Sequence, residues 1–498
     1  MSQGATIAST TPATRRSADD RQHDRRWWIL VILGIAQLMV VLDTTVVNIA
    51  LPSAQHALAF SNSDRQWVIT AYALSFGSLL LLGGRLGDLF GVKRVFLVGL
   101  IGFAVASAVG GAANGFSMLV AARAVQGAFG AILAPAALSL LTTTFTDARE
   151  RSKAFGIYSA IVGSGAAIGL LLGGVLTEYL SWRWCMYVNL AFAVIAFIGA
   201  SILLQHRTAK TRAPLDIPGI VLVSGGLFGI VYGFSHADTA GWSSSVTLGF
   251  LVAGAVLLVG FVVSQLRSAN PLLPLRVVLD RNRGGAYLAI FTVGVGMFGV
   301  FLFLTYYLQQ TLGFSAVRSG LAFLPLTGAV IVVAQIGTNV LAQRIGPRWI
   351  VGPGLTIAAV GMWMLTGLDL TSTYASNVLP ALLVFGVGLG LVFSAAMSNA
   401  TARVDRADAG VASAMVNVGQ QVGGSIGTAL LNTIAATAAS NYAGSHASSP
   451  QLLALAAMHS YHVAFLTSSA ILLGGGILAG LAMRSRPMAA VAEETVAL

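Results

Sequence analysis

Two ionisable side chains of opposite charge lie inside long apolar runs of this sequence. Asp43 falls in the run 27–51 and Arg123 in the run 117–143. In helices that rise 1.5 Å per residue, they would lie at depths of roughly 12 Å and roughly 9 Å from the same side of a membrane. A desolvated carboxylate can take up and release a proton, and a nearby arginine opposes the uptake. The pair is therefore a candidate for proton coupling, with a static ion pair that fixes two helices as the alternative.

Neutral polar side chains are scattered through the same apolar runs. Some should line a central cavity and others should bridge helices; for any single one, packing is favoured over ligand contact. Four of these side chains are Asn189, Gln309, Asn399 and Gln421. The eight candidates for a substrate cavity are Gln37, Asn48, Tyr72, Gln126, Tyr158, Tyr306, Asn417 and Gln420.

The elements that position these side chains are predicted to be membrane-spanning helices, because apolar runs of about 20 residues suffice to cross a bilayer. Of the 28 Lys and Arg residues, 24 fall in the two tails and in every second connector, whereas Arg65, Arg183 and Arg318 fall on the opposite side. Basic connectors stay in the cytoplasm. We therefore expect a multi-pass protein of the bacterial inner membrane with both termini cytoplasmic. The fourteen predicted spans are 27–51, 66–83, 95–113, 117–143, 155–176, 184–204, 217–236, 246–266, 285–308, 319–342, 349–368, 378–398, 411–435 and 461–483.

The composition agrees with a membrane protein and argues against other classes. Hydrophobic residues make up 56% and charged residues 9% of the chain, whereas soluble domains carry about 25% charged residues. The net charge of +11 follows from the basic connectors and does not indicate nucleic-acid binding. The single cysteine, Cys185, excludes an internal disulfide. His446, His459 and His462, in or beside the predicted outer connector 436–460, lack acids or cysteines nearby, so no metal site is expected.

An internal repeat divides the chain. The stretch 84–93 is echoed by 339–348, 255 residues later, and three glycines of the fifth span are echoed in the thirteenth, 254 residues later. Repeated halves are how many secondary transporters are built, with the substrate site at the midplane between them. The predicted divisions are a cytoplasmic tail 1–26, a six-helix bundle 27–205, a linker with two extra helices 206–266, a second six-helix bundle 267–483 and a cytoplasmic tail 484–498.

The connector 84–94 contains glycines and an aspartate at fixed spacing, which a merely basic connector would not need. Its glycines allow a tight turn and close helix approach. Its aspartate can cap a helix or pair with a nearby arginine. We expect this connector to form a cytoplasmic gate. The gate residues are Gly84, Arg85, Gly87, Asp88, Gly91, Lys93 and Arg94.

These segments together carry a resemblance to a known family. The connector 84–94 resembles the signature loop of the major facilitator superfamily. The segments 42–52 (Leu-Asp-Thr-Thr-Val-Val-Asn-Ile-Ala-Leu-Pro), 119–128 and 165–174 are similar to motifs of its fourteen-span drug/proton antiporters, and the resemblance covers 27–483. It implies an all-α fold of two six-helix bundles plus two extra helices, fourteen in all, that works by alternating access. It also implies a packing role for the fifth-span glycines, which are Gly165, Gly169, Gly173 and Gly174. The first three are expected to form a sliding contact between the two halves.

One position departs from that pattern. Leu170 stands where the antiporter motif of the family has proline. Without proline the fifth helix keeps its backbone hydrogen bond and is expected to be straighter. The glycine spacing remains, so exchange is still favoured over symport.

The resulting hypothesis is a proton-coupled exporter of small lipophilic drugs or antibiotics, neutral or singly cationic, that functions as a monomer in the lipid bilayer. No phosphate-binding loop of the Gly-x-x-x-x-Gly-Lys-Ser/Thr type is present, so the proton gradient rather than ATP is the expected energy source, with no cofactor. Two alternatives remain: an importer or uniporter of a small metabolite, and a membrane receptor without transport. A membrane enzyme is not expected, because no metal-ligand cluster or Ser–His arrangement is evident among the spans.

Overall fold

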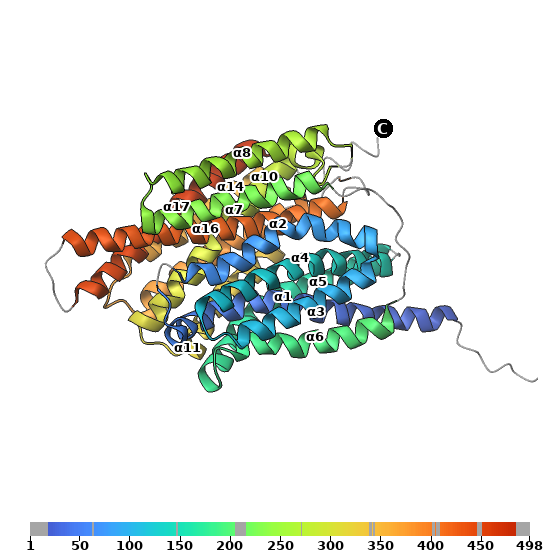
Figure 1. The fold of residues 1–498 in the computed structure, drawn as a ribbon, viewed down its shortest axis with the longest axis horizontal. Coiled ribbons are helices and arrows are strands. Elements are labelled where there is room, and N and C mark those ends of the chain that lie inside the picture. The colour runs from blue at the N-terminus through green and yellow to red at the C-terminus, as the bar shows by residue number, and fades with distance from the viewer. Residues whose placement is uncertain are drawn as a thin grey trace, which may run out of the picture.

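The computed structural model describes residues 18–61, 64–145, 148–204, 216–269, 271–337, 341, 344–400, 404, 409–445 and 451–484. The described residues form a bundle of long helices with no β-strand (Figure 1). The first half contains α1 (Ala18–Leu58), α2 (Gln66–Phe90), α3 (Val92–Gly111), α4 (Phe116–Thr144), α5 (Ala148–Tyr179) and α6 (Trp184–Leu203). It is followed by α7 (Ile217–Ala240) and α8 (Ser245–Arg267).

The second half is less regular than the first. It begins with α9 (Leu275–Leu279) and α10 (Arg281–Gly299), which continues into the π-helical turns η1 (Val300–Leu304) and η2 (Tyr307–Thr311). Pro325 removes a backbone donor and interrupts the predicted span 319–342 near its start. The remaining elements are α11 (Ala316–Ala322), α12 (Leu324–Ile336), α14 (Arg348–Met364), η4 (Leu365–Gly367), η5 (Tyr374–Val378), α15 (Leu379–Ala400), α16 (Ala409–Ser445) and α17 (Leu452–Ala482).

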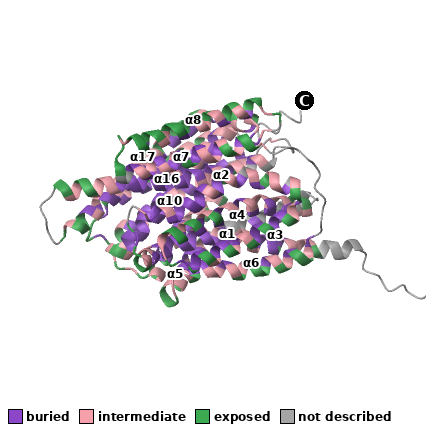
Figure 2. Ribbon diagram, in the orientation of Figure 1, coloured by how far each residue is buried: buried purple, intermediate pink, exposed green. Residues whose placement is uncertain are grey.

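The fold is that of a membrane protein. Twelve helices of the described chain are long and apolar enough to cross a bilayer, and α2 and α5 contribute the shorter apolar stretches Gln66–Leu80 and Ala167–Tyr179. With these two, the helices agree with the fourteen predicted spans. Apolar side chains on the outside of the bundle are exposed, as on α8, where Val256 and Val259 are each 64% exposed (Figure 2). Lipid rather than water suits such a surface.

Both described chain ends lie at one end of the bundle (Figure 1). We call this end the terminal face; α2, α8 and α17 end there. The opposite end, where Leu58 and Tyr179 end α1 and α5, is called the distal face. The chain reverses between these faces with each successive span.

The repeat read from the sequence has a structural counterpart. In the first half, Gly165, Gly169 and Gly173 of α5 pack against α1. In the second half, Gly423 and Gly427 of α16 pack in the same way against α10, the first spanning helix of that half. A Cβ at any of these five positions would press on the facing helix. The glycines therefore permit the same close helix pair twice.

Two predicted connectors are largely helical. The predicted gate 84–94 is mostly the last turns of α2 and the first of α3; Gly91 alone forms the turn, at φ +88°, which favours glycine. The prediction that 436–460 forms an outer connector without helix is wrong. There α16 continues to Ser445 and α17 begins at Leu452, and the two helices extend past their neighbours at the distal face (Figure 1). Their Ala-rich sequences favour helix over loop.

Candidate functional site

The carboxylate of Asp43 is fully buried and accepts three side-chain hydrogen bonds. Its Oδ2 accepts from Arg123 Nη1 at 2.5 Å, an ion pair in which the arginine is 2% exposed. Its Oδ1 accepts from Gln126 Nε2 at 2.7 Å and from Asn189 Nδ2 at 2.8 Å. These donors come from α4 and α6 and meet the carboxylate on α1. Three donors suit an ionised carboxylate, whose two oxygens only accept hydrogen bonds.

The guanidinium of Arg123 is held from several sides. Its Nε donates to the carbonyl oxygen of Val68 at 3.1 Å, and its Nη1 donates to Gln126 Oε1 at 2.7 Å. The ring of Tyr72 lies 4.4 Å from the guanidinium carbon, in a cation–π arrangement. Since Val68 and Tyr72 belong to α2, the site joins that helix to α1 and α4.

Ser107 completes the network from α3. Its hydroxyl donates to the carbonyl oxygen of Met186 at 2.7 Å and accepts from Asn189 Nδ2 at 3.0 Å and Gln126 Nε2 at 3.2 Å. The Asp43 network, as we call Asp43, Arg123, Gln126, Asn189 and Ser107, thus lies wholly within the first half. The side-chain oxygen of Asn189 has no hydrogen-bond partner there.

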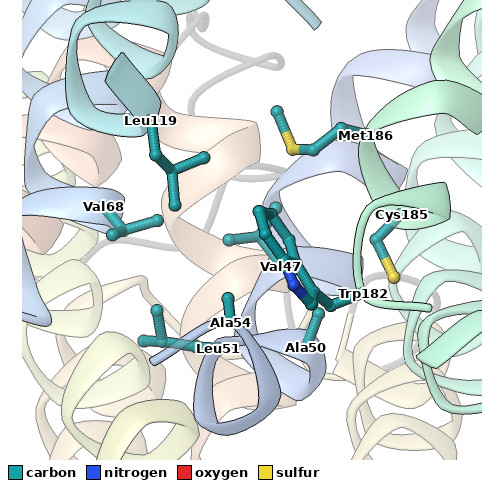
Figure 3. A pocket seen from close by; sticks show the side chains of 9 residues that line it. All are labelled: Val47, Ala50, Leu51, Ala54, Val68, Leu119, Trp182, Cys185 and Met186. Carbon is teal, nitrogen blue, oxygen red and sulfur yellow. The ribbon is translucent and has the colours of Figure 1, made fainter. Parts of the chain in front are cut away.

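A small apolar cavity is lined by nine residues (Figure 3), among them Val47, which lies about one helical turn after Asp43 on α1. Its volume of about 10 Å³ is close to that of one water molecule. Drug-sized ligands need several hundred Å³, so this cavity is a gap in packing. The lining residues are Val47, Ala50, Leu51, Ala54, Val68, Leu119, Trp182, Cys185 and Met186.

The other predicted cavity residues are not gathered at the Asp43 network. Tyr158 donates to Gln37 Oε1 at 2.8 Å. Asn48 donates to the carbonyl of Thr44 in its own helix. On α16, Gln420 is half-buried and Asn417 is exposed. Of the eight candidates, Tyr72 and Gln126 are the two that belong to this site.

Tyr306 belongs to a different place, near the distal face. Its hydroxyl donates to Gln55 of the first half, and its ring lies under the guanidinium of Arg65. It therefore contacts the first half from the second.

The fifth-span glycines contact two different partners. Gly165, Gly169 and Gly173 face α1 of their own half, which corrects the expectation of a sliding contact between halves. Gly174 faces Ala316 and Val317 of α11, in the second half. At Leu170, α5 is unbroken, as expected without proline.

The predicted gate has partners on both halves. Lys93 Nζ donates to the carbonyl oxygens of Ser201 at 2.9 Å and Leu204 at 2.5 Å, at the end of α6. Arg85 Nη2 donates to the carbonyl of Pro271 at 3.1 Å, beyond α8. Arg94 is exposed. The side chain of Asp88 lies outside the described part of the structure, so its latch role stays a prediction.

No cluster of metal-ligand side chains occurs among the described residues. His459 stacks on Tyr442 at 5.0 Å, and His462 bonds the carbonyl of Leu368. His446 lies outside the described residues. These contacts give the two described histidines packing roles.

Sequence reasoning missed the roles of three residues. Ser107 resembles many small residues in an apolar helix, so nothing in the sequence marks it. Asn189 was recognised as a polar residue in a span, but its partner could not be chosen without the helix arrangement. Arg65 was placed in a connector, whereas the structure buries it to 7% exposure.

Comparison with known proteins agrees with the fold. A family model described as the Major Facilitator Superfamily matches residues 33–428. The chain is 48% identical over 468 residues to puromycin resistance protein pur8 of Streptomyces alboniger, covering 94% of this chain and 93% of that protein. It is 32% identical over 434 residues to the multidrug efflux pump LfrA of Mycolicibacterium smegmatis, covering 86% and 84%.

Another relative and a solved structure extend the comparison. The cephamycin export protein CmcT of Amycolatopsis lactamdurans is 38% identical over 408 residues, covering 81% of this chain and 84% of that protein. A bacterial homologue of the human lysosomal transporter Spinster, inward-facing and unoccupied, superposes with a TM-score of 0.63 at 16% identity, covering 92% of this chain and 97% of that chain. At that identity the likeness supports the fold alone.

Proposed function

The chain belongs to the major facilitator superfamily, and we propose that it is an efflux transporter that exports small lipophilic drugs or antibiotics in exchange for protons. The support comes from relatives named for puromycin resistance, cephamycin export and multidrug efflux. The observation that carries the proton coupling is the fully buried Asp43 carboxylate bonded to Arg123. A buried ionisable pair inside a membrane protein is by default a functional site.

Asp43 is proposed to bind the transported proton. In the ionised form it accepts hydrogen bonds from Arg123, Gln126 and Asn189. A proton on Oδ2 would cancel the charge that Arg123 balances and replace its acceptor lone pair with a donor. Arg123 would then lack a carboxylate partner in a low-dielectric site, which is costly. The network thus has two arrangements, and moving between them can bias the helices α1, α4 and α6 that carry it.

Alternating access is proposed to use the terminal-face contacts as a gate. Arg85 and Lys93 bond backbone carbonyls of neighbouring segments there. Asp88 on the same helix end is proposed to latch this face, which would alter the balance of open states rather than substrate affinity. Gly174 provides a close contact with α11 of the second half.

We further propose that the terminal face is cytoplasmic in a bacterial inner membrane, because the basic connectors lie there. The protein is proposed to act as a monomer, without nucleic acid or cofactor and without an enzymatic reaction. Its substrates are proposed to be neutral or singly cationic, since a second uncompensated charge in a low-dielectric site costs several kcal/mol.

The test uses purified protein in proteoliposomes with an imposed pH gradient. A lipophilic dye should move against the direction of proton flow, and collapse of the gradient should stop it. Protein-free vesicles are the control. Movement of dye in the same direction as protons would support an importer, and binding without flux would support a receptor.

A further inference from the structure

Arg65 is a buried cation outside the Asp43 network. It precedes α2 near the distal face and is 7% exposed. Its guanidinium carbon lies 4.2 Å from the centre of the Tyr306 ring and 5.6 Å from that of Phe303. Its Nε donates to Asn432 Oδ1 of α16 at 3.3 Å. Each of these partners belongs to the second half, so Arg65 reaches across from one half to the other.

Among the described residues, no carboxylate lies within ion-pair distance of Arg65. The neighbouring acid, Asp64, instead accepts from the hydroxyl of Ser61 at 2.7 Å. Ring faces and an amide oxygen offset part of the cost of burying a cation. They do not supply a negative charge, so Arg65 differs from a structural ion pair.

A second buried donor without a partner lies beside Arg65. The amide nitrogen of Asn432 is buried, with the residue 1% exposed, and has no hydrogen-bond partner. It belongs to the same amide that bonds Arg65. A guanidinium with several N–H groups and an unpartnered amide N–H together suit a carboxylate or carbonyl oxygen.

We propose that Arg65 and Asn432 form a substrate subsite for a carboxylate, exposed when the halves separate at the distal face. The inference rests on the proposed export function and adds a preference within it. Zwitterionic compounds that carry a carboxylate are favoured over purely cationic ones. Closure at the distal face returns Arg65 to the rings of Tyr306 and Phe303 and releases the carboxylate.

Rhodamine 110 and its methyl ester, rhodamine 123, are a matched test pair. Rhodamine 110 is a zwitterion with a free carboxylate, and rhodamine 123 is a cation without one. Gradient-driven export of both dyes is measured for the intact protein and for Arg65→Gln. The ratio of rhodamine 110 to rhodamine 123 export should fall about tenfold, the effect of losing one charge-assisted hydrogen bond.

Asn432→Asp is the second variant. A carboxylate at this position would neutralise Arg65 and should lower the same ratio, while it would strengthen a purely structural contact between the halves. Arg183→Gln is the control, because Arg183 is also near the distal face but bonds the carbonyls of Gly111 and Ala113 within the first half. The control should leave the ratio unchanged.

The outcomes separate the two proposals. Equal loss of both dyes in Arg65→Gln, with an unchanged ratio, would overturn the subsite and leave Arg65 as a contact between halves. Export of rhodamine 123 but not rhodamine 110 by the intact protein would also overturn it, without affecting the export function. Absence of gradient-driven movement of either dye would overturn both proposals.

Discussion

Two buried arginines in this protein have opposite surroundings. Arg123 is 2% exposed and pairs with the Asp43 carboxylate at 2.5 Å. Arg65 is 7% exposed and lies against Tyr306 and an amide, with no acid at ion-pair distance among the described residues. One lies inside the first half and the other between the halves. The comparison separates a charge that already has its partner from one that does not.

We propose that the two sites act on different transported species. A paired charge can be switched by the smallest ligand, a proton on Asp43, because the proton cancels the charge that Arg123 balances. An unpaired cation is costly to bury and is stabilised by an acceptor from outside, such as an oxygen of the substrate. We therefore expect protons to bind at the Asp43 network and Arg65 to recognise the chemical groups of the transported compound.

Replacing Asp43 should have the largest effect on transport. Asp43→Asn should abolish export driven by a pH gradient, because Asn keeps the size and one acceptor oxygen but cannot titrate. Proton release on addition of substrate to the purified protein should disappear as well. The measurements are dye flux in proteoliposomes and the pH change in a weakly buffered solution.

Asp64→Asn is the matched control for this prediction. Asp64 lies in the turn before α2, bonded to Ser61, and its replacement should leave proton coupling intact. Normal gradient-driven export by Asp43→Asn would refute the assignment of Asp43 as the proton carrier.

Removing the partner of Asp43 should have the next largest effect. Arg123→Ala leaves a buried carboxylate unpaired, which in proteins costs about 3–5 kcal/mol of folding stability. Arg123→Lys keeps the charge but lacks the planar fork that bonds Asp43 and Val68 together, so only partial rescue of transport is expected. Thermal unfolding and dye flux measure the two effects, and full activity in both variants would show that the pair has no role in transport.

The spanning helices and the proximity of Asp43 and Arg123 could be predicted from the sequence, because apolar length and charge placement are local properties. The partners of Asp43 could not. Ser107 and Asn189 come from α3 and α6, and only the packing of the helices brings them to the carboxylate. The exposure of Arg65 was also predicted wrongly. It follows a short polar turn, which predicts exposure, but the second half covers it.

Removing the Asn189 amide should have a smaller effect on transport than replacing Asp43 or Arg123. Asn189→Ala removes one of the two amide donors to Asp43 Oδ1 and leaves Arg123 in place. Losing this bond leaves Gln126 as the one described amide donor to Asp43 Oδ1. Gradient-driven dye export in proteoliposomes should therefore fall about tenfold, because a hydrogen bond to a charged group contributes about 1.5 kcal/mol or more.

Thr292→Ala is a matched control for a lost side-chain hydrogen bond, since Thr292 bonds the carbonyl of Leu288 within α10. It should leave the rate of export unchanged. Unchanged export by Asn189→Ala would mean that this amide does not contribute to the proposed role of the Asp43 network.

The smallest expected effect concerns a third cation, whose surroundings lie between the two extremes. Lys93 near the terminal face bonds the carbonyl oxygens of Ser201 and Leu204, so it has acceptors but no carboxylate among its described partners. Lys93→Gln should slow transport by only about two- to fivefold, because a partly exposed cation at a helix C-terminus contributes about 0.3–1 kcal/mol. Substrate affinity should not change, since the contact can influence only the balance of open states.

Arg94→Gln is the control: it removes the same charge from an exposed neighbour and should leave the rate within error of the intact protein. Equal slowing by both variants would assign the effect to the positive charge of this face rather than to the bonds that Lys93 makes with the end of α6.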